Sequence, residues 1–138
     1  MMNYLLRALA CLALFCVAAQ AQLAVAVSPP KVIGQKAVVP LAMKNNFSDK
    51  IESARAAVFL LDEQGKMVGQ ATHWVIGGNQ DRPGLAAGAT NVFYFVVNNA
   101  THLPMTNLTT KVTFNRIVLE GSKLADVNKD VSVIQTAK

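Results

Sequence analysis

Short runs in which apolar and polar residues alternate follow one another along this chain of 138 residues. Alternation with a period of two is typical of strands that bury one face. No stretch beyond residue 22 carries apolar residues at helical spacing over a useful length. The pattern predicts an all-β fold with strands at residues 23–27, 37–44, 51–61, 66–76, 91–98, 110–120 and 127–136.

The number of strands and the length of the chain favour one architecture. Seven short strands separated by turn signals predict an antiparallel immunoglobulin-like β-sandwich. The Cys…Trp…Cys spacing of true immunoglobulin domains is absent, so this expectation concerns the architecture alone. The best-defined unit is the β-hairpin 51–76, with its turn at Asp62-Glu63-Gln64-Gly65. Pro40 lacks a backbone N–H, which predicts an edge strand or a break there, and we expect such an edge to be able to pair with a partner strand.

The first 21 residues have the features of a leader for export. Arg7 supplies a positive charge, residues 8–19 are apolar or small, and Ala19-Gln20-Ala21 fits an A-x-A cleavage site. We therefore expect residues 1–21 to be a signal peptide, residues 22–138 to form one domain, and the protein to be periplasmic or extracellular. The alternative is an uncut anchor at residues 8–27, which is long enough to span a bilayer and would give the domain membrane contact.

Cleavage of this leader would also remove both cysteines, Cys11 and Cys16. The remaining chain would hold no disulfide and no thiolate metal site. The chain has 13 basic and 8 acidic residues, and the basic residues are scattered singly. This spacing favours a solvated surface over a nucleic-acid site. The partner that we expect is an unknown protein or a cell-surface component.

The side chains that usually carry chemistry are few. His73 and His102 are the only histidines, and nothing in their spacing favours a shared metal site. The segment 126–130 opens like a calcium loop, but Val131 and Ala137 replace the required glycine and acid, so we expect a turn leading into the last strand. The eight acidic residues fall mostly at predicted turns. We assign no catalytic, cofactor-binding or metal-binding residue and expect no enzyme and no cofactor.

Two polar loops, 77–90 and 99–107, are candidates for ligand binding at an end of the sandwich. By strand alternation His73 and Trp74 face opposite sides, and a core position for Trp74 would turn His73 outward. We expect Trp74 in the core and Tyr94 to pack, with its hydroxyl at the sheet edge. Asn46, Asn99 and Asn107 begin N-glycosylation acceptor sequences, which would matter only in a eukaryotic source.

Residues 44–49 read KNNFSD, and residues 53–69 read SARAAVFLLDEQGKMVG. Together they resemble the FxLYD-type domains of bacterial exported proteins, in which an Asn-rich turn precedes a strand ending in a Leu-Tyr-Asp-like triplet and a returning strand. Leu61 stands at the tyrosine position. Residues 85–88 and 93–97 are similar to the segment that follows. The resemblance covers residues 37–98 and implies an exported, non-enzymatic immunoglobulin-like module without shared catalytic residues.

These observations support three hypotheses of function. The first is a secreted or periplasmic, non-enzymatic interaction or structural module. The second is a carbohydrate- or peptide-binding domain that uses loops 77–90 and 99–107, and an exposed aromatic cluster beside those loops would favour it. The third is an enzyme, which a concave pocket holding His73 or His102 within reach of Asp81 or Asp130 would favour.

Overall fold

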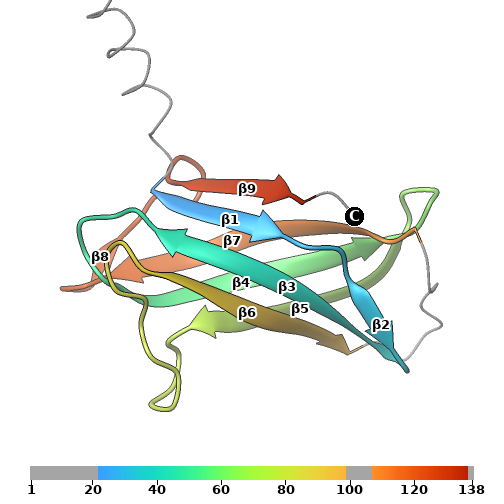
Figure 1. Cartoon of the computed structure of the whole chain (residues 1–138), viewed down its shortest axis with the longest axis horizontal. Helices are drawn as coiled ribbons and strands as arrows, with labels where there is room; N and C mark the ends of the chain where they lie inside the picture. Colours follow the sequence, from blue (N-terminus) through green and yellow to red (C-terminus); the bar gives the residue numbers. More distant parts are fainter. Residues whose placement is uncertain (1–21, 99–106, 137–138) are drawn as a thin grey trace, which may run out of the picture.

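The computed structural model describes residues 22–98 and 107–136, which form two β-sheets packed face to face (Figure 1). The strands are β1 (Leu23–Val27), β2 (Lys31–Ile33), β3 (Lys36–Asn45), β4 (Ile51–Leu61), β5 (Met67–Ile76), β6 (Thr90–Asn98), β7 (Thr109–Leu119), β8 (Lys123–Leu124) and β9 (Val131–Gln135). No helix of these residues is long and apolar enough to cross a membrane. Residues 1–21, which include Cys11, Cys16 and the predicted leader, lie outside the described residues. So do residues 99–106, which include Asn99, His102 and most of the predicted binding loop 99–107.

The prediction of an all-β sandwich is confirmed at the level of two packed sheets. Six predicted strands agree with the structure to within one residue at each end, and β1 and β4 agree at both ends. The last strand begins at Val131 rather than at residue 127, because the carboxylates of Asp126 and Asp130 hold the preceding residues in a turn. The short strands β2 and β8 were not predicted.

The first sheet, sheet A, is built around β3. β6 pairs along one side of β3, β1 and β2 follow each other along the other side, and β9 pairs with β1. The expectation of a wholly antiparallel sandwich is wrong at one pair, since β1 and β9 are parallel. Both strands begin at the same end of the sheet, where the amides of Gln22 and Leu23 donate to the carbonyl of Asp130.

Pro40 lies within β3, which has neighbours on both sides and runs unbroken from Lys36 to Asn45, so both the edge-strand interpretation and the predicted break in the strand are wrong. The Pro40 carbonyl accepts a hydrogen bond from the Ser28 amide at 3.1 Å. In an antiparallel ladder the carbonyl and the amide of one residue face the same neighbour. The missing N–H of Pro40 therefore falls where β1 has ended at Val27 and β2 has not yet begun at Lys31.

The second sheet, sheet B, has the order β5-β4-β7-β8. Its β4 alternates apolar residues toward sheet A, and residues such as Val58, Leu60 and Ile117 meet Val25, Leu41 and others of sheet A in one core. Every residue of that buried core lies between Leu23 and Leu119. The described residues thus supply a continuous core of their own, and we expect residues 22–138 to fold without the preceding residues.

Candidate functional site

Among the described strands, β5 pairs only with β4 and β6 only with β3, and we call the opposite edge of each its free edge with respect to these strands. The two free edges lie beside each other on one open side of the sandwich, along the lower edge of the view in Figure 1. A cleft of about 250 Å³ opens there. We call it the edge cleft; its walls are His73, Trp74 and Val75 of β5, Phe93, Tyr94, Phe95 and Val96 of β6, and Arg82 of loop 77–90. The cleft therefore combines an aromatic lining with one cation from a predicted binding loop.

The structure reverses the expected orientations of His73 and Trp74. Trp74 lies opposite Arg55 of β4, and the Arg55 guanidinium carbon is 5.9 Å from the centre of its ring. Arg55 is exposed, so Trp74 lies on the outer face of sheet B, half-buried, and not in the core. His73 lies opposite the fully buried Ala56 and therefore points toward the inner face. The alternation was correct, and only the assignment of the buried face was wrong.

His73 bridges the two sheets at the open side of the sandwich. Its Nε2 donates to the carbonyl oxygen of Val96 at 3.1 Å. Its ring lies 4.9 Å from that of Phe95, centre to centre, and Phe95 belongs to the core. The imidazole is nevertheless exposed, because the sheets meet only at their edges here. His73 thus forms the floor of the edge cleft on the β5 side.

The backbone of β6 offers hydrogen-bonding groups to the same cleft. The Val96 carbonyl faces away from β3, since it accepts from His73 across the open side. Backbone groups alternate sides along a strand. The N–H and C=O of Tyr94, two residues earlier, therefore also face the cleft. The Tyr94 side chain is 69% exposed, and the expectation that it packs is wrong.

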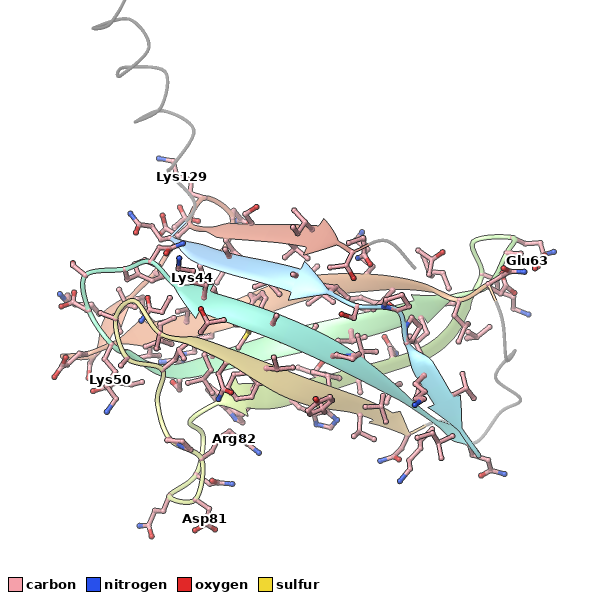
Figure 2. All side chains as sticks on the ribbon, in the orientation of Figure 1. Lys44, Lys50, Glu63, Asp81, Arg82 and Lys129 are labelled. Carbon is pink, nitrogen blue, oxygen red and sulfur yellow. The ribbon has the colours of Figure 1, made fainter. Side chains whose placement is uncertain are left out.

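Loop 77–90 brings Arg82 to the cleft. The Arg82 guanidinium donates from Nη1 to the carbonyl of Gly77 at 2.9 Å, which holds the side chain back toward β5. Gly78 has φ +87°, and a Cβ there would lie 2.5 Å from Cγ of Trp74. Only glycine fits this position, because the loop passes directly over the indole. Figure 2 shows Arg82 on the side of the loop nearer β6 and Asp81 at its far tip.

The buried amide of Asn45 anchors the end of this loop. Asn45 is fully buried, and its Nδ2 donates to the carbonyls of Asp49 at 3.0 Å and Leu85 at 2.9 Å. Its Oδ1 accepts from the amide of Phe47 at 2.9 Å. The Leu85 amide and carbonyl also pair with Ile51. In the sequence, Asn45 falls between the predicted strands 37–44 and 51–61, and nothing distinguishes this asparagine from its neighbour Asn46.

The other candidate residues do not join the cleft. No carboxylate is among the described residues that line it, so His73 has no acid beside it of the kind that the enzyme hypothesis required. Asp126 accepts the amides of Asn128 and Lys129, and Asp130 accepts that of Asp126, as the predicted turn requires. Within residues 22–98 and 107–136, no group of three or more His, Cys, Asp or Glu side chains could hold a metal ion.

Comparisons with known proteins give one informative likeness. No family model matches the chain, and no curated protein matches it. Among solved structures, the chain is similar to a Bordetella pertussis protein assigned as ApaA, with a TM-score of 0.50 and 19% sequence identity. The match covers 75% of this chain and 84% of that one. At this level of identity the likeness shows a shared fold and nothing about function.

Proposed function

We propose that this protein is an exported, non-enzymatic interaction module with an immunoglobulin-like sandwich, and that it binds an extended peptide segment of a protein partner in the edge cleft. Export is supported by the leader features of residues 1–21. The immunoglobulin-like assignment is supported by the two packed sheets and by the FxLYD resemblance of residues 37–98. The observation that carries the proposal is the free edge of β6.

An exposed strand edge is a template for a further strand. The Tyr94 N–H and C=O face the edge cleft, where an extended peptide can pair with them and lengthen sheet A. Main-chain pairing of this kind supplies affinity, and pockets for alternate side chains supply specificity. Trp74 and Phe93 would form the apolar contacts of such a peptide.

Arg82 adds a preference for acidic peptides. A guanidinium can bind a carboxylate through two parallel hydrogen bonds, and a partly desolvated pair is stronger than one in open water. Arg82 is half-buried at the wall of the edge cleft, and no acid of the described residues lines that cleft to neutralise it. We therefore expect peptides with a terminal or side-chain carboxylate near one end to bind best.

A carbohydrate is the second candidate ligand. Tyr94 is 69% exposed, and it lines the same cleft as the half-buried Trp74, beside loop 77–90. Aromatic rings combine a large apolar face with a polar edge, which suits a sugar ring. One exposed and one half-buried aromatic side chain beside loop 77–90 support the second hypothesis. We prefer a peptide as the ligand, because a sugar stacked on the aromatic rings would leave the N–H and C=O groups of the β6 edge without hydrogen-bond partners.

The single tryptophan of the chain provides the test, since Trp74 lies in the cleft and its fluorescence reports on occupancy. Seven-residue extended peptides ending in a free carboxylate are titrated against the same peptides with N-methylated backbones. We expect the unmodified peptides to bind and the N-methylated peptides not to bind. Arg82→Ala should weaken the binding by roughly 10-fold, because it removes one charge-assisted contact. Arg116→Ala is the matched control, because Arg116 of β7 is exposed and does not line the cleft.

Two results would reject peptide binding by strand addition. Equal affinity for native and N-methylated peptides would show that main-chain pairing is not used. Binding of an oligosaccharide that Tyr94→Ala removes, together with no response to any peptide, would select the carbohydrate function instead.

A further inference from the structure

The outward face of sheet A is apolar along its middle. The strand register places Ile134, Ala26, Ala42 and Val92 in one row across four strands, and Pro40 and Tyr94 in the next. We call these six residues the apolar face. Ile134 is 60% exposed and Val92 is 45% exposed, so the row is open to solvent at both ends. Between them the alanines leave a shallow hollow of about 260 Å³ that Ile134 and Lys44 border. This face looks toward the viewer in Figure 1.

Cations flank the apolar face at both ends. Lys44 stands beside the hollow, on the row next to Ala42 (Figure 2). Lys31 and Lys36 occupy the opposite end of the same face, where Lys31 lies across from Val38. All eight acidic residues of the chain lie outside the strands of sheet A. The face is therefore an apolar centre between two positive ends, with no acid in its strands to neutralise them.

This charge pattern disfavours a second copy of the chain as the occupant. Because both ends of the face carry lysines, a copy turned about a twofold axis would bring lysine against lysine in either orientation. The flanking cations are also all lysines, and lysine is depleted in protein–protein interfaces whereas arginine is enriched. Lysine stems that lie along an apolar surface with the ammonium at the rim suit a layer of lipid phosphates instead.

We propose that the apolar face docks on an anionic phospholipid surface, with Ile134, Val92 and Tyr94 entering the boundary between headgroups and acyl chains and the three lysines contacting phosphates. The apolar face and the edge cleft share Tyr94 and no other residue, so docking on lipid is a function beyond peptide binding. It needs no leader. The sequence connected membrane contact only to an uncut leader, whereas sheet A provides a contact surface within residues 23–135.

Vesicle co-sedimentation of residues 22–138, which contain the core of the described residues, tests the proposal with residues 1–21 removed. The probes are vesicles of phosphatidylcholine alone and vesicles that also contain phosphatidylglycerol. We expect binding to the anionic vesicles only. Lys31→Glu, Lys36→Glu and Lys44→Glu combined should weaken that binding on the order of 100-fold, because each lysine near the surface contributes about 1 kcal/mol. The control is Lys66→Glu, Lys111→Glu and Arg116→Glu combined, with the same change in net charge outside sheet A.

A second pair of variants tests the apolar contact. Ile134→Ser should reduce the vesicle partition coefficient by roughly 10-fold, the effect of losing one buried isoleucine. Leu124→Ser is the matched control, since Leu124 is 67% exposed on β8 in the other sheet. Thermal melts of all variants verify that each is folded.

Three outcomes would overturn the proposal. The first is no binding to anionic vesicles by the unaltered domain. The second is equal losses in the two triple variants, or in the two serine variants, which would mean non-specific attraction to the bilayer. The third is a concentration-dependent dimer in sedimentation velocity that Ile134→Ser dissociates, which would assign the face to a second copy.

Discussion

The two open sides of the sandwich are bridged by similar bonds but differ in what surrounds them. On one side His73 of sheet B donates to the Val96 carbonyl of sheet A at 3.1 Å. On the other side Gln135 of sheet A donates to the Thr110 carbonyl of sheet B at 2.8 Å. Thr110 is only 4% exposed, whereas His73 is exposed beside the edge cleft. A polar bridge therefore spans each side. Trp74, Arg82 and Tyr94 surround the His73 bridge, and they make that side a candidate site.

The largest loss of stability is expected at Asn45, the buried residue that anchors the loop at the cleft side. In Asn45→Asp, a carboxylate oxygen would replace the Nδ2 that now donates to the carbonyls of Asp49 and Leu85. A buried charge facing two acceptors should cost about 3 kcal/mol in the free energy of unfolding. Urea unfolding measures the loss, and Asn115→Asp at an exposed position of β7 is the control. A change equal to the control would mean that Asn45 does not anchor the loop that carries Arg82.

On the opposite side, removal of the Thr110 hydroxyl should increase the stability of the fold. The Oγ1 of Thr110 is buried and has no hydrogen-bond partner in the described part of the chain. Thr110→Val keeps the shape and leaves the backbone carbonyl that Gln135 uses, so it should stabilise the fold by about 1 kcal/mol. The midpoint of thermal unfolding is the measurement, with exposed Thr113→Val for comparison. A lower midpoint for Thr110→Val alone would contradict this prediction.

Removing the bridge on that side should have a moderate cost. Gln135→Met retains the length of the side chain but removes the donor to the Thr110 carbonyl. The partly buried carbonyl then loses its partner, and we expect a loss of about 1 kcal/mol in urea unfolding. Lys129→Met in the preceding turn serves as a surface control. An unchanged unfolding curve would mean that this bond does not close the sandwich.

The smallest effect is expected for the equivalent bridge at the cleft. His73→Phe keeps a ring against Phe95 and removes the donor to Val96. Because this bond lies in solvent, its loss should cost about 0.5 kcal/mol, less than that of Gln135→Met. The same urea experiment compares the two variants. A larger loss of stability for His73→Phe than for Gln135→Met would contradict this prediction, because it would mean that the bridge at the cleft contributes more to stability than the bridge on the opposite side.

The hairpin of β4 and β5 could be predicted because its turn is determined locally. Asp62 Oδ1 accepts the amides of Gln64 and Lys66, and Gly65 adopts φ +77°, so residue types alone specify the turn. The orientation of Trp74 could not be predicted in the same way. Alternation shows only that His73 and Trp74 point to opposite sides, and β5 is an edge strand whose two faces are both partly exposed.

The edge cleft itself depends on tertiary pairing. It requires β5 and β6 to be edges of different sheets that meet on one side, and no local pattern in either strand encodes that. The position of Pro40 in the sheet also depends on tertiary pairing. The sequence shows that Pro40 lacks an N–H, but β3 can hold Pro40 between two neighbours only because β1 has ended and β2 has not begun opposite it.

The most direct test of the peptide site is to map amide and indole chemical shifts of residues 22–138 by ¹H–¹⁵N NMR as an extended, carboxylate-ending peptide is added. The account predicts shifts at Tyr94, Val96, Arg82 and the indole N–H of Trp74, with Thr110 and Gln135 unchanged. Shifts concentrated at Thr110 and Gln135, with the β6 edge unaffected, would contradict it.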